Sequence, residues 1–212
     1  MKILSSLVLL FALIGTPAFA ATSADNSAEE NAVDQNTLDE LNPFAPNIEE
    51  QLQMLDEKYE AETGKSPFQI DSLIPTWAET CVREQCPVYL DISKSEQSAY
   101  LYVNGVLQGE FLVSSGVSGR DTPDFDRHPD GRIYDRYTST KFPGGDYDGL
   151  GNMPYAVFIK GGFAVHGTGR GNWKKLGTKA SHGCIRMHPD NGYRFNRLVR
   201  AYGVRSTWIR VR

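Results

Sequence analysis

Residues 164–187 read AVHGTGRGNWKKLGTKASHGCIRM, and this stretch organises the rest of the chain. It brings His166, His182 and Cys184 together within two dozen residues that also include five glycines. A thiolate is a strong nucleophile, an imidazole can accept its proton, and a glycine-rich backbone can present amide N–H groups to a developing oxyanion. The stretch therefore predicts a cysteine acyl-transfer site.

The spacing of the residues in the sequence does not decide whether His166 or His182 is the base for Cys184. An unassisted thiol with a pKa of about 8.5 is only slightly ionised at neutral pH, so Cys184 needs a partner. His182 lies two residues before Cys184, and in an extended segment the two side chains share a face. His166 ends a strand-like run beside Gly167, where backbone carbonyls can hold its other ring nitrogen, and this favours His166. The N–H groups of Gly183 and Cys184 are the expected oxyanion donors.

The N-terminus has the layout of a secretory signal peptide. Met1-Lys2 is followed by an apolar run from Ile3 to Ile14 and then by small residues that end at Ala20. We expect residues 1–20 to be removed by a cut after Ala20. The apolar run is shorter than the roughly 20 residues that cross a bilayer, and no later segment approaches that length. The prediction is a periplasmic protein without a membrane span.

Three cysteines remain after the cut: Cys81, Cys86 and Cys184. An oxidising compartment favours a bridge between the close pair Cys81 and Cys86, which leaves Cys184 as the odd thiol. A disulfide needs Cα atoms about 5.5 Å apart, and residues five apart in one helix are farther than that. Any helix must therefore end between the two cysteines, and Pro87 is a reason for it to do so.

Charge divides the chain into an acidic N-terminal part and a basic remainder. Residues 21–62 hold twelve acidic side chains and one lysine, whereas residues 63–212 hold twenty basic and fourteen acidic ones. We expect a disordered acidic arm at 21–46, a helical extension at 47–86 and a catalytic domain at 87–212. A basic catalytic part suits a substrate with carboxylates, and the export signal argues against a nucleic-acid partner.

The extension carries one clear helix signal. Asn47 and Glu50 have the spacing of a capping box, and Gly64 and Pro67 stop the pattern. A further short helix is expected after Pro75. The apolar residues that recur at helical spacing, and that we expect to dock on the main domain, are Ile48, Leu52, Leu55 and Tyr59.

From Pro87 the periodicity changes from helical to alternating, so the domain is expected to be mainly β. Asn104-Gly105 predicts a type I′ turn between two strands. Residues 116–131 and 141–154 are expected to be loops. The expected strands are 88–92, 99–103, 106–113, 133–137, 156–159, 163–166 and 204–211, and a helix is expected from Pro189 to Gly203.

His166-Gly-Thr and Ser181-His-Gly-Cys184-Ile-Arg-Met together resemble the signature of the L,D-transpeptidase catalytic domain, also called YkuD. The resemblance covers about residues 87–212. It includes the Leu-Tyr-Val-Asn-Gly hairpin, the Thr122-Pro123 loop and Asn152-Met-Pro-Tyr155. It implies a β-sandwich with a packed C-terminal helix, preceded here by the short helical extension. It also implies that Cys184 is the nucleophile and His166 the base.

By the same resemblance, the Gly167 carbonyl holds the base, at a position where some relatives place a serine. The implied chemistry needs no metal or cofactor: Cys184 attacks a peptidoglycan tetrapeptide stem after its third residue, releases D-alanine and passes the acyl group to an amine. That amine belongs to a second stem, a wall-anchored lipoprotein or a free D-amino acid, and carbapenems are expected to acylate the thiol. Residues 124–130 depart from the family pattern as an insertion beside the site. The implied substrate-binding residues are Ser181, His182, Arg186 and Tyr155.

Three alternatives stay open. Water could replace the amine, which gives an L,D-carboxypeptidase or a hydrolase that releases a wall-linked protein. A non-catalytic wall-binding domain would keep the fold without the chemistry. A zinc metallohydrolase would use nitrogen and sulfur ligands from His166, His182, Cys184 and His188.

Overall fold

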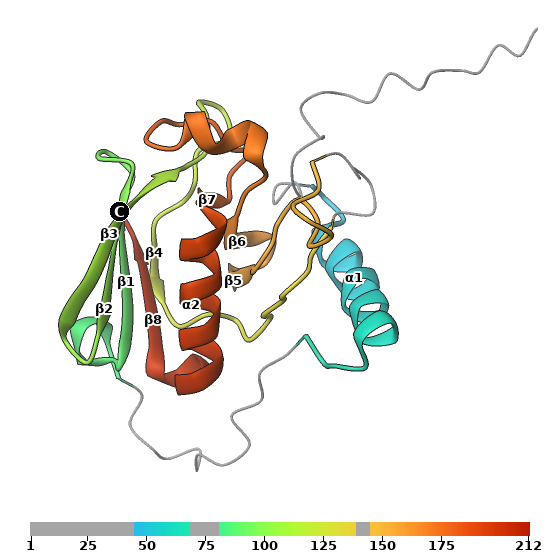
Figure 1. The fold of residues 1–212 in the computed structure, drawn as a ribbon, viewed down its shortest axis with the longest axis horizontal. Helices are drawn as coiled ribbons and strands as arrows, with labels where there is room; N and C mark the ends of the chain where they lie inside the picture. The colour runs from blue at the N-terminus through green and yellow to red at the C-terminus, as the bar shows by residue number, and fades with distance from the viewer. Residues whose placement is uncertain (1–44, 68–80, 139–144) are drawn as a thin grey trace, which may run out of the picture. The chain divides into compact units, whose positions relative to one another are not determined.

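The computed structural model describes residues 45–67, 81–138 and 145–212, and in these ranges the chain is mainly β with a helix near its C-terminus (Figure 1). The described strands form one hydrogen-bonded order, β4-β8-β1-β2-β3-β7-β6-β5. The strands are β1 Val88–Ser93, β2 Ser98–Val103, β3 Val106–Ser114, β4 Phe125–Arg127, β5 Val157–Lys160, β6 Phe163–Gly167, β7 Ile185–Met187 and β8 Thr207–Val211. The α-helices are α1 Ile48–Thr63 and α2 Pro189–Tyr202, and 3₁₀ turns lie at Arg83–Gln85, Arg170–Lys175 and Val204–Ser206.

The first three strands form the expected antiparallel meander. Asn104 and Gly105 join β2 to β3 with φ angles of 49° and 75°. Two successive positive φ values are what a type I′ turn requires, and this turn suits the right-handed twist of the strands that flank it. The hairpin is therefore encoded locally.

Strand β3 links the two halves of the order, because it pairs with β2 on one side and with β7 on the other. Beyond β7, β6 runs parallel to it and β5 antiparallel to β6. The main core draws on both halves and on α2, whose Phe195 and Val199 are buried in it. Pro189 occupies the first turn of α2 and Gly203 ends it, so this helix has the bounds expected from the sequence.

Three local expectations were wrong. The 116–131 loop contains β4, which pairs antiparallel with β8 at the sheet edge. The expected strand 133–137 reduces to one bridge between Ile133 and Val157. Asn47 makes no capping bond, because its side chain instead accepts a hydrogen bond from Gln51 at 2.7 Å.

Helix α1 docks on the rest of the chain through the stripe seen in the sequence. Leu52, Leu55 and Tyr59 are buried in a second cluster, and Ile48 packs against its edge. Gly64 ends the helix in the left-handed conformation, with φ of 66°. Helix α1 is thus part of the folded structure.

The expected signal peptide, nearly all of the acidic arm and the helix after Pro75 lie outside the described residues. Within the described ranges, neither α-helix combines the length and the apolar character that a membrane crossing would require.

Candidate active site

Strand β6 carries the candidate imidazole, and the candidate thiol immediately precedes β7. The two strands are parallel, with Val165 paired to Ile185 and His166 to Arg186. Val165 and Ile185 point into the main core, whereas Ala164 and Cys184 belong to the second cluster, on the opposite face. Because side chains alternate along a strand, His166 shares the face of Ala164. Because Cys184 directly precedes Ile185, it lies next to the stretch of β6 that runs from Ala164 to His166.

His166 is held in one tautomer by its own backbone neighbour. Its Nδ1 lies 2.7 Å from the carbonyl oxygen of Gly167, and the side chain is fully buried. A carbonyl can only accept, so Nδ1 carries the proton and the lone pair of the neutral ring is on Nε2. This nitrogen is the one that can act as a base.

Only glycine fits at position 167, because α2 approaches β6 closely there. A Cβ at this position would lie 2.9 Å from Pro189 Cα and 3.1 Å from Pro154 O. A Cβ on Gly192 of α2 would in turn come within 2.9 Å of the Gly167 nitrogen. Two glycines thus allow the start of α2 to press on the strand end that carries His166.

Cys184 is the free cysteine and is fully buried. Its Sγ lies 3.4 Å from the carbonyl oxygen of Gly162, in the turn between β5 and β6. A carbonyl oxygen can only accept a hydrogen bond, so this contact suits an S–H group. A peptide can reach Sγ only when part of its cover moves.

The loop before Cys184 closes on itself through Ser181. The Ser181 hydroxyl donates to the Cys184 carbonyl at 2.6 Å and accepts from the Gly183 N–H at 3.0 Å. The expectation that Gly183 donates to an oxyanion therefore needs correction, because its N–H already has an internal acceptor. Ser181 itself is fully buried and shapes the loop from inside.

Arg186 also lies inside the protein, although the resemblance implied a substrate contact. It is 1% exposed, and its Nη1 donates to the Ala180 carbonyl at 2.7 Å. Because it is buried and makes this bond, Arg186 holds in place the segment that leads into Ser181. His182, by contrast, is only half-buried and remains the polar side chain of this loop that a ligand could reach.

Tyr155 flanks the end of β6 in a strained backbone conformation. Its φ is 61°, which non-glycine residues rarely adopt, and its N–H donates to Asp135 O at 3.0 Å. Its ring lies 5.1 Å from that of Tyr193 in α2, and partial burial raises the pKa of the phenol. The preceding Pro154 carbonyl accepts from the Gly167 N–H at 2.8 Å, so Tyr155 is tied to the histidine strand.

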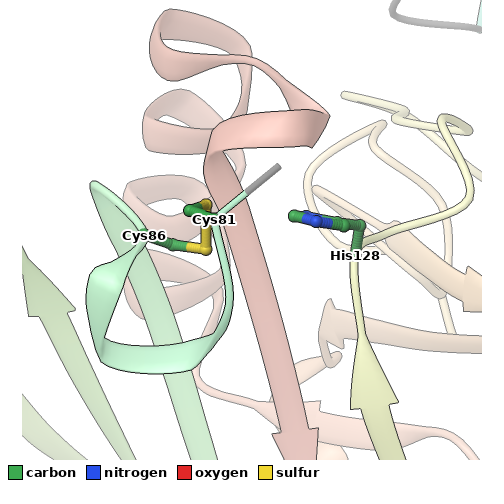
Figure 2. Close-up of side chains that lie close together, drawn as sticks. All are labelled: Cys81, Cys86 and His128. Carbon is green, nitrogen blue, oxygen red and sulfur yellow. A yellow bond between two sulfur atoms is a disulfide. The ribbon is translucent and has the colours of Figure 1, made fainter. Parts of the chain in front are cut away.

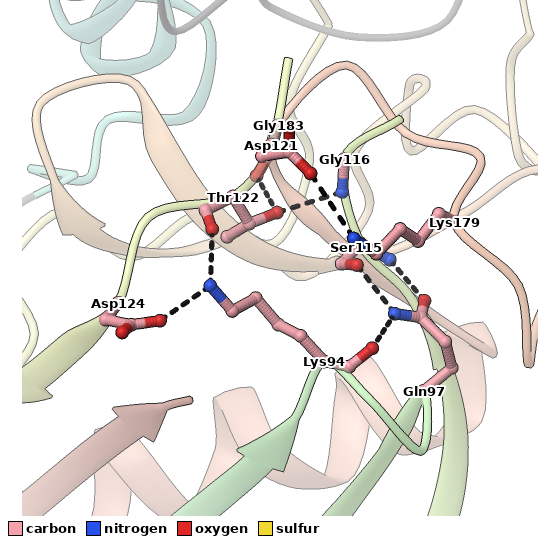
Figure 3. Close-up of polar contacts among 9 residues, drawn as sticks. All are labelled: Lys94, Gln97, Ser115, Gly116, Asp121, Thr122, Asp124, Lys179 and Gly183. Carbon is pink, nitrogen blue, oxygen red and sulfur yellow. Dashed lines mark hydrogen bonds and ion pairs between the residues drawn. The ribbon is translucent and has the colours of Figure 1, made fainter. Parts of the chain in front are cut away.

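Thr122 is a site residue to which sequence reasoning assigned no role. Its Oγ1 donates to the Gly183 carbonyl at 2.6 Å and accepts from the Gly116 N–H at 2.9 Å, as Figure 3 shows. Lys94 holds the Thr122 carbonyl at 2.9 Å. The available signal was the Thr122-Pro123 pair, but 61 residues separate Thr122 from Gly183 along the chain.

Helix α1 contributes side chains to the same buried cluster as Cys184. Leu52, Leu55 and Tyr59 share the second cluster with Cys184. Tyr59 contacts the Tyr134 ring at 5.0 Å, and Tyr134 in turn contacts Tyr137 at 4.4 Å. The helix therefore supports the aromatic layer in which the candidate nucleophile is buried.

The zinc alternative finds no support in the arrangement of its proposed ligands. Within the described ranges, the one group of three potential ligand atoms within 4.8 Å of one another is formed by Cys81, Cys86 and His128. Cys81 and Cys86 form a disulfide across the 3₁₀ turn at 83–85, with their Cα atoms 4.9 Å apart. Figure 2 shows the His128 ring directed toward this bridge. Sulfur atoms in a disulfide are not thiolate ligands.

The described chain is thus a mainly β protein with a buried imidazole on β6 and a buried thiol just before β7. The chain belongs to the family of the L,D-transpeptidase catalytic domain, YkuD, whose sequence profile matches residues 87–202. No curated protein matches the chain.

Three solved structures illustrate the similarity. The LD transpeptidase LdtMt1 in complex with imipenem is 25% identical over 60% of this chain and 59% of its own, with a TM-score of 0.48. An L,D-transpeptidase from Mycobacterium smegmatis is 20% identical over 60% and 59%, with a TM-score of 0.43. The catalytic domain of the Enterococcus faecium L,D-transpeptidase is 19% identical over 64% and 99%, with a TM-score of 0.45. The chain thus spans less than two thirds of the length of the first two of these proteins.

Proposed function

We propose that this protein is an L,D-transpeptidase that acts on peptidoglycan tetrapeptide stems through an acyl-enzyme on Cys184. One observation carries the proposal: His166, whose Nδ1 lies 2.7 Å from the Gly167 carbonyl, is on β6, and β6 pairs in parallel with the strand that Cys184 immediately precedes. This arrangement gives the thiol a base whose lone pair is already on Nε2.

In the first half-reaction, Sγ attacks the carbonyl carbon of the third stem residue while its proton passes to His166 Nε2. The tetrahedral intermediate collapses, the C–N bond to D-alanine breaks, and the imidazolium returns the proton to the leaving amine. The product is a thioester on Cys184. A backbone donor that stabilises the oxyanion contributes about 3 kcal/mol to such a step.

In the second half-reaction, an acceptor amine attacks the thioester carbon and gives a proton to His166. The C–S bond then breaks and the thiol is restored. The proposed acceptor is the amine of a second stem, of a wall-anchored lipoprotein or of a free D-amino acid. The proposed compartment is the periplasm, to which the signal peptide of residues 1–20 would direct the protein. The proposed mechanism uses no cofactor.

The test is incubation of the purified protein with disaccharide-tetrapeptides, followed by mass spectrometry. Cross-linked dimers with released D-alanine support transpeptidation, whereas D-alanine with tripeptides alone assigns hydrolysis. Cys184→Ala should abolish both products and the mass increase that a carbapenem produces. Turnover that persists in this variant would refute the thiol mechanism.

A further inference from the structure

We propose that Thr122 is a positioning residue for acyl transfer: its hydroxyl fixes the peptide between Gly183 and Cys184 and thereby aims the Cys184 N–H at the substrate oxyanion. The inference rests on the proposed cysteine mechanism. It assigns a role to a side chain on a loop far from the signature motif in sequence.

The partners of the Thr122 hydroxyl allow its O–H bond only one direction. The side chain is 2% exposed, and Oγ1 lies 2.6 Å from Gly183 O and 2.9 Å from Gly116 N. The Gly116 N–H can only donate and the Gly183 carbonyl can only accept. The single hydroxyl proton must therefore point at Gly183; Figure 3 marks both contacts of the hydroxyl as dashed lines.

Fixing one carbonyl fixes the next amide. The Gly183 C=O and the Cys184 N–H belong to one planar trans peptide and point in opposite directions. Gly183 has φ of 127°, in the region that glycine enters freely and other residues avoid. Without an anchor this peptide could rotate, and the Cys184 N–H would turn with it.

The neighbouring polar atoms are anchored from the other side. Ser181 accepts from the Gly183 N–H at 3.0 Å and donates to the Cys184 carbonyl at 2.6 Å. With the bond from Thr122, both carbonyls and the first amide of the Gly183-Cys184 pair have protein partners in fixed directions. The orientation of the Cys184 N–H is therefore set before substrate arrives, which is the condition for electrostatic stabilisation of a transition state.

Thr122 stands on a rigid support. Lys94, at the end of β1, donates to the Thr122 carbonyl at 2.9 Å and pairs with Asp124 at 2.6 Å. A Cβ on Gly116 would lie 1.9 Å from Arg120 O, so the turn that presents the Gly116 N–H accepts only glycine. The anchor thus connects the β1 end to the catalytic loop.

The experiment separates two reactions of Cys184. Acylation by a carbapenem passes through an oxyanion, whereas alkylation by iodoacetamide needs the thiolate but forms no oxyanion. Thr122→Val keeps the shape and removes the hydroxyl. We expect it to slow acylation by about 100-fold, the loss typical of one misplaced oxyanion donor, and to change alkylation by less than about twofold. With tetrapeptide substrate, kcat should fall while KM changes little.

Two further variants serve as controls. Thr122→Ser retains the hydroxyl and should restore acylation to within a few-fold of wild type. Lys179→Met removes an exposed ion pair with Asp121 on the same loop and should leave both reactions unchanged. If Thr122→Val does not fold, Lys94→Met, which removes the bond to the Thr122 carbonyl and the exposed pair with Asp124, should show a smaller selective loss of acylation.

Each outcome decides the inference. Wild-type acylation by Thr122→Val, or an equal loss in both reactions, would overturn the positioning role. A wild-type protein that is alkylated at Cys184 but never acylated would instead contradict the proposed function itself.

Discussion

Asp56 of α1 and Arg132 of the segment before β5 form an ion pair at 3.2 Å, and the same carboxylate accepts a hydrogen bond from the Tyr134 hydroxyl. Both charged side chains are largely buried, at 13% and 19% exposure. Tyr134 lies in the cluster that contains Cys184. A helix outside the matched domain is therefore coupled to the surroundings of the candidate nucleophile.

Asp56→Ala tests this coupling. It leaves the Tyr134 hydroxyl and part of the Arg132 guanidinium without their acceptor, so we expect a loss of about 2–3 kcal/mol in the free energy of unfolding. Looser docking of α1 should also speed alkylation of the buried Cys184, the free thiol of the chain. Denaturant titration and mass spectrometry measure the two effects. Glu57→Ala, on the exposed side of the same helix, is the control, and equal alkylation rates in both variants would contradict the coupling.

Asp130 gives stability a defined pH dependence. Burial raises the pKa of its carboxyl, against the opposing hydrogen bonds and charge of Arg132. A raised folded-state pKa means that the folded protein binds the proton more tightly than the unfolded chain. The contribution to stability is therefore complete below the ordinary Asp pKa of about 4 and is lost as pH rises through the folded value.

The measurement compares wild type with Asp130→Asn by denaturant unfolding at several pH values. Asparagine does not titrate, so the stability of wild type relative to the variant should be greatest in acid and should decline as pH rises. A relative stability that instead grows with pH would reverse the sign of the shift. Asp56, whose pKa burial also raises, should behave in the same direction.

The parts of the fold that the sequence predicted are those with local causes. The Asn104-Gly105 turn, the apolar stripe of α1 and the Pro189 to Gly203 helix each depend on neighbouring residues. Strand β4 escaped prediction because its residues form a strand only by pairing with β8, more than 80 residues later. The capping box failed because Gln51 competes for the Asn47 side chain.

For the candidate site too, the sequence predicts the features with local causes and misses those that depend on distant contacts. The sequence predicted that His166 lies near the end of a strand, as it does in β6, and its meeting with Cys184 stays a prediction. The burial of Ser181 and Arg186 could not be predicted, because it depends on how the catalytic loop folds back onto Ala180 and Cys184. The spacing of the motif carries no such information.

Gly167→Ala should damage both packing and chemistry. The added methyl would lie 2.9 Å from Pro189 Cα, a backbone atom that cannot move aside easily. We expect a loss of about 1–3 kcal/mol in the free energy of unfolding and a lower kcat, because the Gly167 carbonyl that holds His166 must shift. Gly171→Ala, where nothing lies within 4 Å of the new Cβ, is the matched control and should leave both quantities near wild type.

Replacement of the two histidines should rank their roles. His166→Ala removes the proposed base and should lower kcat by about 100-fold or more. Its effect on the free energy of unfolding should be limited to the cost of losing one buried ring. His182→Ala should mainly raise KM, since this half-buried side chain is proposed to contact substrate. Steady-state kinetics with a tetrapeptide measure both, and a larger kcat loss in His182→Ala would exchange the two assignments.

Tyr134 and Tyr137 offer a matched pair, because their rings contact each other at 4.4 Å but their hydroxyls differ. The Tyr134 hydroxyl donates to Asp56, whereas the Tyr137 hydroxyl is buried without a hydrogen-bond partner in the described part of the chain. Burial also raises the pKa of Tyr137 well above its ordinary value, so the phenol stays neutral. Removal of a satisfied buried hydroxyl costs stability, whereas removal of an unsatisfied one relieves a desolvation penalty.

Tyr134→Phe should therefore lower the free energy of unfolding by about 1–2 kcal/mol, and Tyr137→Phe should leave it unchanged or raise it by up to about 1 kcal/mol. Denaturant unfolding of the two variants in parallel measures the difference, and ring packing cancels because each substitution keeps the ring. If Tyr137→Phe proved as destabilising as Tyr134→Phe, the Tyr137 hydroxyl would have a partner, such as a buried water, beside Cys184.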